Sequence, residues 1–310
     1  MLSSTSRRVG LVVALVLVVS PLAVASASAP AVDRPDRATP GSEEGKAVRS
    51  HVVAAAGDIS PRSLGHQRGT ARLVERIDPA KVLALGDLQY PRGAYADFRT
   101  YYDPTWGRFK ARTLPSAGNH EYLTEDAAGY FRYFGDAGRS HGHSYYSTKL
   151  GGWRLISLDS NIARGNISAQ VRWLKRVLAA SDEKCTLAFW HHPRFNSGLE
   201  HGNNASVTPF WTALYGARAD LVLNGHEHVY ERFARQTPAA VHSGEGIREF
   251  VVGTGGAETY EFGSPEPNSQ VRVSGRYGVL RLVLRPASYS WRLVAANDEV
   301  LDRGGPVACH

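Results

Sequence analysis

The sequence predicts an α/β domain in which buried strands alternate with helices. Short apolar or β-branched runs recur from about residue 50 onward, and each is followed by a break containing Gly, Asp, Asn or His. Helix-like stretches separate several of these runs, and the last part of the chain alternates like a hairpin. In such a domain, ligands are expected beyond the carboxyl ends of the strands.

The predicted strands are short apolar runs with turn residues directly after them. They lie at Val52–Ala56, Val82–Leu85, Leu155–Leu158, Leu187–Trp190, Leu221–Leu223 and Phe250–Val252. The hairpin joins Gly278–Arg285, which alternates leucines with Arg and Val, to Tyr289–Ala295. No internal repeat and no second domain are apparent in the sequence.

Two helices are predicted between the strands. Ser168–Ala180 has Ser168 as a capping residue and places Val171, Leu174 and Leu178 on one face, with basic residues on the other. A second helix is predicted over His66–Ile77.

The first 29 residues have the layout of a secretory signal peptide. The basic pair Arg7 and Arg8 precedes an apolar run, Val9–Val19, and then a string of Ala and Ser. A membrane anchor is the alternative, but the run is shorter than the roughly 20 apolar residues that a span needs. Residues 30–49 combine prolines with charges of both signs and predict a flexible linker. We therefore expect a protein that is secreted or delivered to a periplasmic or cell-wall space, with no membrane span after signal removal.

The cysteine content and the net charge indicate in which compartment the protein works and what kind of ligand it prefers. The chain has two cysteines, Cys185 and Cys309, and an even pair in an exported chain favours a disulfide, with two buried thiols as the alternative. The net charge of +7 falls to about +5 when the two signal arginines are removed, which favours anionic ligands. The basic residues are scattered along the sequence, so specific nucleic-acid binding is not expected.

Five segments carry residues that can bind metal ions, and four of them directly follow a predicted strand. They are Gly57-Asp58, Gly86-Asp87-Leu88-Gln89-Tyr90, Gly118-Asn119-His120-Glu121, Trp190-His191-His192-Pro193 and Gly225-His226-Glu227-His228. Carboxylates are hard oxygen ligands, and imidazoles suit transition metals. Taken singly, each segment could be an ordinary turn or a buried hydrogen-bonded histidine, but their combination indicates a metal site.

The order of these segments resembles the calcineurin-like metallophosphoesterase superfamily, over about Val52 to Gly256. Two details are similar to its purple acid phosphatase branch: Tyr90 follows Asp87 by three residues, and His228-Val229-Tyr230-Glu231-Arg232 completes the last motif. Most other branches have Asp-x-His in the first segment, whereas this chain has Ser60 at the histidine position. The resemblance implies a catalytic domain over residues 50–310, built as a β-sandwich of two mixed sheets flanked by helices, a four-layer αββα arrangement.

The resemblance also implies a centre of two metal ions, Fe³⁺ plus a divalent Fe, Zn or Mn ion. One site would use Asp58, Asp87, Tyr90 and His228, and the other would use Asp87, Asn119, His191 and His226, with Asp87 as the bridge. His192 stays open as an alternative to His191. His120 would stabilise the transferring phosphoryl oxygens or help protonate the leaving group, and His201 would be a second proton donor.

The function expected from this centre is hydrolysis of small phosphate monoesters by attack of a metal-bound hydroxide. A phosphodiesterase or nucleotidase on the same centre is one alternative. A secreted metal-binding protein without turnover is another, although the presence of His120 beside the ligands argues against it. A zinc protease is disfavoured because the His-Glu-x-x-His spacing is absent.

Overall fold

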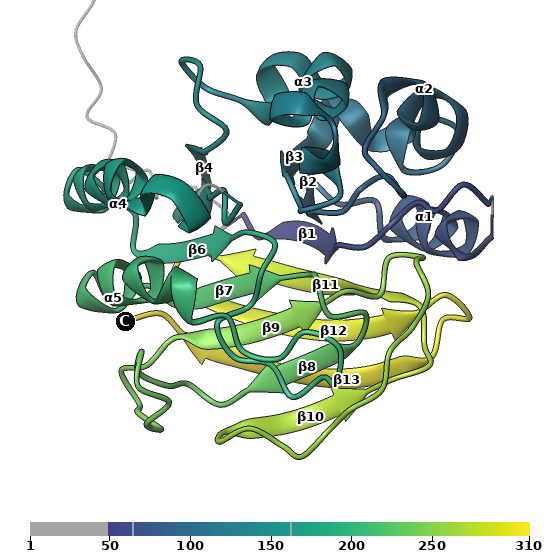
Figure 1. Cartoon of the computed structure of the whole chain (residues 1–310). Coiled ribbons are helices and arrows are strands. Elements are labelled where there is room, and N and C mark those ends of the chain that lie inside the picture. Colours follow the sequence, from purple (N-terminus) through teal and green to yellow (C-terminus); the bar gives the residue numbers. More distant parts are fainter. Residues whose placement is uncertain (1–48, 64, 162) are drawn as a thin grey trace, which may run out of the picture. The chain divides into compact units, whose positions relative to one another are not determined.

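The computed structural model describes residues 49–63, 65–161 and 163–310 (Figure 1). The predicted signal peptide and all but the last residue of the predicted linker lie outside the described residues. Among the helices of the described ranges, none combines the length and the hydropathy that crossing a membrane requires.

Two sheets form the centre of the domain (Figure 1). The six-stranded sheet has the order β13-β12-β11-β1-β2-β3, with bounds β1 His51–Ala56, β2 Lys81–Leu85, β3 Thr113–Ser116, β11 Gly278–Arg285, β12 Ser288–Ala295 and β13 Val300–Ala308. The seven-stranded sheet has the order β10-β8-β9-β7-β6-β5-β4, with bounds β4 Tyr146–Leu150, β5 Trp153–Ser157, β6 Cys185–Phe189, β7 Leu221–Asn224, β8 Tyr230–Phe233, β9 Arg248–Val252 and β10 Ser269–Val273. Both sheets contain parallel and antiparallel pairs, so the predicted class of two mixed sheets is confirmed.

Helices flank the sheets. The α-helices are α1 His66–Ile77, α2 Tyr95–Asp97, α3 Ala128–Phe134, α4 Ala163–Ala179 and α5 Thr208–Gly216. Shorter 3₁₀ or π turns occupy Phe98–Tyr102, Trp106–Arg112, Glu121–Leu123, Glu125–Ala127, Gly135–Gly138 and Ala205–Val207.

Apolar residues fill the layers between these elements. Leu83 of β2, Leu187 of β6 and Phe250 of β9 belong to one buried cluster that includes residues of both sheets. A second cluster joins α4 and α5, through Leu174 and Phe210, to the seven-stranded sheet. Burial of large apolar side chains is the dominant stabilising contribution in such layers.

The predicted strands and helices differ from the structure in two informative places. β3, which precedes Asn119, was not predicted because it has only four residues and contains Pro115. Proline is tolerated there because β3 is an edge strand of its sheet. The start of the helix predicted over Ser168–Ala180 was wrong. The corresponding helix, α4, begins at Ala163, and Ile167 extends its apolar face by one turn.

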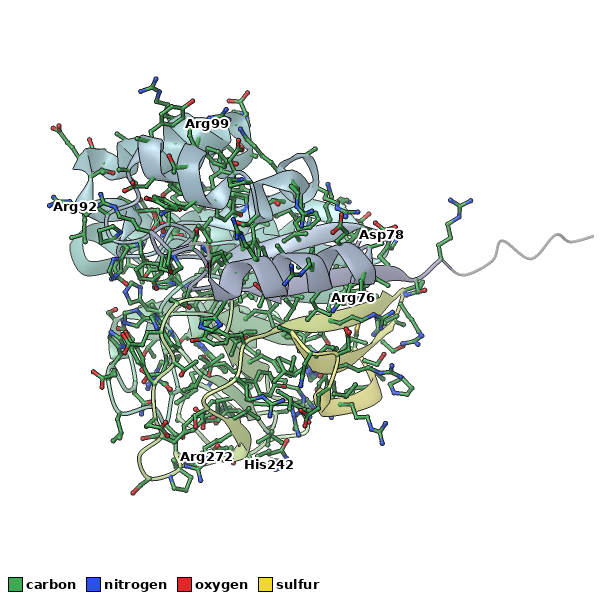
Figure 2. The ribbon with its side chains drawn as sticks, turned by 90° about the vertical axis from the view of Figure 1, so that its right-hand side faces the viewer. Arg76, Asp78, Arg92, Arg99, His242 and Arg272 are labelled. Atoms are coloured by element: carbon green, nitrogen blue, oxygen red, sulfur yellow. A yellow bond between two sulfur atoms is a disulfide. The ribbon has the colours of Figure 1, made fainter. Side chains whose placement is uncertain are left out.

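Two long-range links connect parts of the domain that are distant in sequence. A disulfide joins Cys185, the first residue of β6, to Cys309, just after β13, with α-carbons 5.5 Å apart. At the end of α1, Arg76 forms an ion pair of 2.6 Å with Asp298 in the turn between β12 and β13; Figure 2 labels Arg76. The disulfide therefore ties the two sheets together.

Candidate metal centre

Five strands deliver the predicted ligands to one edge of the sandwich. Asp58 follows the last residue of β1 by two positions, and Asp87, His191 and His226 follow β2, β6 and β7 at the same spacing. Asn119 comes three residues after β3. Because β1, β2 and β3 are parallel, and β6 and β7 are parallel, their carboxyl ends meet at this edge.

Close backbone approach explains the glycines that precede these ligands. A β-carbon on Gly86, where φ is +86°, would lie 2.5 Å from the ring of His191. A β-carbon on Gly118 would lie 2.1 Å from a carboxylate oxygen of Asp87. Asp58, Asp87 and His226 themselves adopt positive φ values of 58°, 49° and 73°. Such conformations are sparsely populated by residues other than glycine, and they concentrate at functional sites.

One half of the centre gathers around the phenol of Tyr90. Its oxygen lies 3.0 Å from Oδ1 of Asp58, 3.3 Å from Oδ2 of Asp87 and 3.0 Å from Nε2 of His228. The other ring nitrogen of His228, Nδ1, bonds to the carbonyl of Glu258, which directs Nε2 toward the cluster. Four donor groups therefore converge on one point.

The other half gathers around Nε2 of His191. This atom lies 3.2 Å from Oδ2 of Asp87, 3.1 Å from Oδ1 of Asn119 and 3.2 Å from Nδ1 of His226. Nδ1 of His191 donates to the carbonyl of Leu85 at 2.9 Å, so the ring is oriented by a backbone acceptor as metal-binding histidines usually are. Oδ2 of Asp87 belongs to both halves of the centre.

His192 takes a different position from His191. Its Nδ1 lies 2.7 Å from the hydroxyl of Ser160, and its ring packs 4.3 Å from the ring of His226. His191 is therefore the histidine of this pair whose Nε2 lies close to Asp87 and Asn119. A ring nitrogen of His192 lies within 4.8 Å of ring nitrogens of His191 and His226, so His192 borders the same half of the centre.

The buried, closely spaced groups of the centre shift one another's pKa values. Although burial opposes it, the carboxylates of Asp87 and Asp58 raise the pKa of His191 to about 9. Burial also opposes the charged form of Asp87, but His191 and His120 hold its pKa well below the usual range. Burial, together with Asp58 and Asp87, raises the pKa of Tyr90 well above that of a free phenol. A cation placed among these groups would stabilise the deprotonated forms of His191 and Tyr90, and it would be attracted by the carboxylate of Asp87, which is already ionised.

The two candidate catalytic histidines border different halves of the centre and are more exposed than its carboxylates. The ring centroids of His120 and Tyr90 are 4.4 Å apart, and Nδ1 of His120 lies 2.6 Å from the carbonyl oxygen of Pro91. The ring of His201 lies 3.9 Å from the ring of His226. Their side chains are 30% and 35% exposed, compared with 3% for Asp87, so both can meet a ligand that arrives from solvent.

Glu121 holds two of the ligand loops together. Its carboxylate accepts hydrogen bonds from the backbone N–H groups of Asp87, Leu88, Gln89 and Gly118, at 2.7 to 3.2 Å. Glu121 is fully buried. The sequence motif contains this residue, but its bonds to the loop after β2 become visible only in the fold.

Glu227 and Tyr260 are further supporting residues. Glu227 belongs to the last sequence motif, but its contact with His201 could not be predicted from the motif. Glu227 accepts from the backbone N–H of His201 at 3.1 Å, and its Oε2 lies 3.3 Å from Nδ1 of the same histidine. Tyr260 stacks on the ring of His228, with centroids 4.1 Å apart and planes 7° from parallel. Tyr260 lies in a loop segment without a recognisable motif, so no sequence signal pointed to it.

Known proteins share both this sequence pattern and this fold. A family model described as calcineurin-like phosphoesterase matches residues 51–230, more than half of the chain. The chain is 28% identical to purple acid phosphatase 23 of Arabidopsis thaliana, over 60% of this chain and 48% of that protein. It is also 28% identical to a probable purple acid phosphatase 20 of the same plant, over 75% of this chain and 59% of that protein.

The fold comparison agrees with these matches. The structure of the purple acid phosphatase PPD1 from yellow lupin superposes with a TM-score of 0.66 at 17% identity, over 82% of this chain and 53% of that one. The chain spans about half the length of the curated relatives it matches. By its sequence, its fold and its family model, the chain belongs to the calcineurin-like phosphoesterase family.

Proposed function

We propose that this protein is a secreted phosphatase that hydrolyses small phosphate monoesters at a centre of two metal ions. The observation that carries the proposal is the convergence of lone pairs at two adjacent points, around Tyr90 and around His191. Nε2 of His191 faces an aspartate oxygen, an amide oxygen and an imidazole nitrogen, and a single proton cannot satisfy all three. Cations satisfy such clusters, and the mixed O and N donors suit iron, zinc or manganese.

The proposed ligand sets follow the two halves of the centre. One ion, which we assign to Fe³⁺, would be held by Asp58, Asp87, Tyr90 and His228. A divalent ion would be held by Asp87, Asn119, His191 and His226. When bound, the two ions would neutralise the anionic substrate and supply an activated water for the attack on phosphorus.

Proton transfer is assigned to residues of the chain itself. His120 donates from Nδ1 to the carbonyl of Pro91, and this bond leaves Nε2 able to exchange a proton with the substrate. His201 is oriented in the same way by Glu227 at Nδ1. The imidazole of His120 would stabilise the phosphoryl oxygens, and either histidine can deliver a proton to the leaving alkoxide.

Secretion is supported by the disulfide between Cys185 and Cys309, because disulfides persist in oxidising compartments. The relatives that match the chain include a phosphoenolpyruvate phosphatase of Allium cepa, which is 26% identical over 70% of this chain. That name concerns a small phosphorylated molecule, and we propose a substrate of the same size class here.

The test combines metal analysis and a visible spectrum of the purified protein with turnover of matched aryl phosphate mono- and diesters. We expect two metal ions per chain and faster monoester hydrolysis. Faster diester hydrolysis would establish the phosphodiesterase alternative instead. Full metal occupancy without turnover of either ester would mean a metal-binding protein that is not an enzyme.

The role of His120 is tested by its alanine variant. His120→Ala should keep both metal ions, since Nε2 of His120 lies 3.8 Å from the nearest oxygen of Asp87 and is not a donor to the clusters. Its kcat for the monoester should fall by about 10²–10⁴-fold, the usual contribution of a positioned acid or base. A variant with wild-type kcat would remove His120 from the mechanism.

A further inference from the structure

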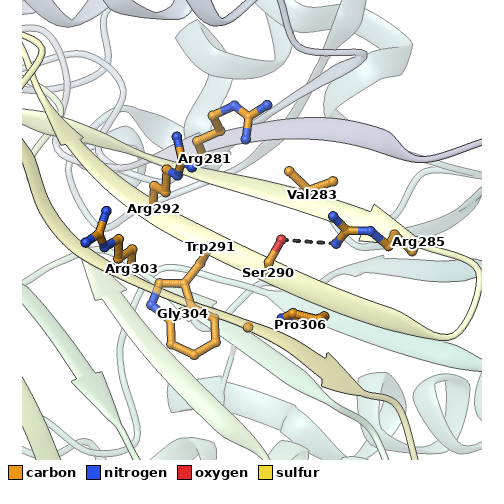
Figure 3. A pocket seen from close by; sticks show the side chains of 10 residues that line it. Arg281, Val283, Arg285, Ser290, Trp291, Arg292, Arg303, Gly304 and Pro306 are labelled. Carbon is orange, nitrogen blue, oxygen red and sulfur yellow. Dashed lines mark hydrogen bonds between the residues drawn. The ribbon is translucent and has the colours of Figure 1, made fainter.

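A row of arginines crosses the outer face of the six-stranded sheet at its β11-β12-β13 end (Figure 3). Arg281 of β11 pairs in register with Arg292 of β12, and Arg292 pairs with Arg303 of β13. Neighbouring strands are about 4.8 Å apart, so the three side chains start from adjacent positions in one line. Arg285 stands further along β11 on the same face.

These arginines lack acidic partners in the part of the chain that the structure describes. None of Arg281, Arg292 and Arg303 forms an ion pair there, whereas Arg232 of the other sheet is paired with Asp302 at 2.7 Å. Like charges directly opposite each other destabilise a sheet. Partial burial and the charge of Arg292 accordingly lower the pKa of Arg281. A bound anion would offset the repulsion between these arginines, so the row is consistent with an anion-binding site.

The arginines line a hollow of about 640 Å³. Small residues, including Ser290, Gly304 and Gly305, form part of its lining, and the hydroxyl of Ser290 accepts a hydrogen bond of 3.1 Å from Arg285. Figure 3 shows the arginine side chains around this hollow. All of the lining residues belong to β11, β12 and β13, and none of them is a proposed metal ligand.

We infer that this hollow binds a chain of linked phosphates, such as inorganic polyphosphate, at a site separate from the metal centre. Each guanidinium presents a planar fork of donors that matches two oxygens of a phosphate group. Four guanidinium groups in one hollow are neutralised best by a ligand with several negative charges close together. In a polyphosphate, every phosphate unit carries at least one negative charge. A single orthophosphate carries too little charge to neutralise the row.

The geometry favours polyphosphate over single-stranded nucleic acid. Proteins that bind single strands add exposed aromatic rings on which the bases stack. The aromatic residue that borders this hollow, Trp291, is only 6% exposed, and its indole nitrogen is bonded to Asp302 at 2.9 Å. A ligand that offers phosphates without bases fits this lining better.

The test measures binding of sodium tripolyphosphate to the full metal-loaded chain by calorimetry. Saturating orthophosphate is present throughout, to occupy the metal centre and suppress turnover. We expect a binding event whose affinity falls steeply with added salt. The variant with Arg292→Gln and Arg303→Gln, two exposed positions, should bind at least tenfold more weakly.

The matched control removes the same charge elsewhere. Arg172→Gln with Arg176→Gln changes two exposed positions of α4, which packs on the other sheet, and should leave the affinity unchanged. Monoester turnover should be unchanged in both variants, so a failure of the proposed phosphatase activity would be seen separately. The inference is overturned if the wild type does not bind tripolyphosphate, if both variants lose affinity equally, or if oligothymidylate binds as tightly as tripolyphosphate.

Discussion

The phenol of Tyr90 lies between two carboxylates and an imidazole, in surroundings that oppose its ionisation. Burial and the charges of Asp58 and Asp87 keep the proton on the oxygen unless a cation competes for it. A trivalent ion provides the stronger competition, because its charge offsets that of both carboxylates. The position of Tyr90 therefore supports the proposed placement of Fe³⁺ in this half of the centre.

Replacing Tyr90 with phenylalanine removes the phenolate and keeps the ring. We expect the Tyr90→Phe variant to lose any visible charge-transfer band of the iron-loaded protein and to bind that ion at least on the order of tenfold more weakly. A visible spectrum with metal analysis measures both. Tyr260→Phe is the matched control, since Tyr260 stacks on His228 but its hydroxyl is not among the converging donors. Persistence of the band in Tyr90→Phe would place the phenolate on another tyrosine.

The candidate ligands could be predicted from the sequence because each stands in a short motif directly after a strand or an edge segment. The supporting residues could not. Glu121 reaches Asp87 across 34 positions, and Tyr260 reaches His228 across 32 positions, so their roles depend on how the loops are folded together. A motif indicates a candidate ligand, while the residue that orients this ligand comes from a distant segment.

At the scale of elements, the apolar parallel strands were predictable and the edge strands were not. β13, at one edge, contains Gly304, Gly305 and Pro306, which are unfavourable in strands. β10, at the edge of the other sheet, combines polar residues with two valines, and none of its five residues is fully buried, so it lacks the apolar run of the other strands. The arginine row was not predictable for a different reason: Arg281, Arg292 and Arg303 become neighbours only through the register of the paired strands.

Glu121 links the loop after β2 to the loop after β3, and its substitution tests how far the centre depends on that link. In Glu121→Gln, the amide NH₂ group would face the two backbone N–H groups that donate to a carboxylate oxygen in the wild type. Two buried N–H groups without an acceptor should lower the free energy of unfolding by about 2–4 kcal/mol. Denaturant unfolding measures this change.

A control for Glu121 lies four residues further along the chain. Glu125→Gln makes the same chemical change at an exposed position and should leave the unfolding free energy within about 0.5 kcal/mol of the wild type. Because the loop after β2 also positions Asp87, Glu121→Gln should lose metal affinity as well. Equal stability of the two variants would mean that Glu121 does not hold the loops.

At the scale of the whole domain, the metal centre and the disulfide lie at opposite ends of the same strand. β6 begins at Cys185 and delivers His191 just beyond its last residue. The disulfide connects this strand to the segment after β13 in the other sheet, across 124 positions of sequence. It therefore restrains the two sheets relative to each other at the edge away from the chemistry.

Removal of the disulfide should accordingly reduce stability and leave the centre intact. For a closed loop of 124 positions, Cys185→Ala with Cys309→Ala should lower the free energy of unfolding by about 4–5 kcal/mol, because the unfolded chain gains freedom. Metal content and kcat at room temperature should match the wild type. Denaturant unfolding with and without reductant measures the effect, since the reduced wild type should approach the double variant. A double variant as stable as the oxidised wild type would show that packing between the sheets suffices without the covalent link.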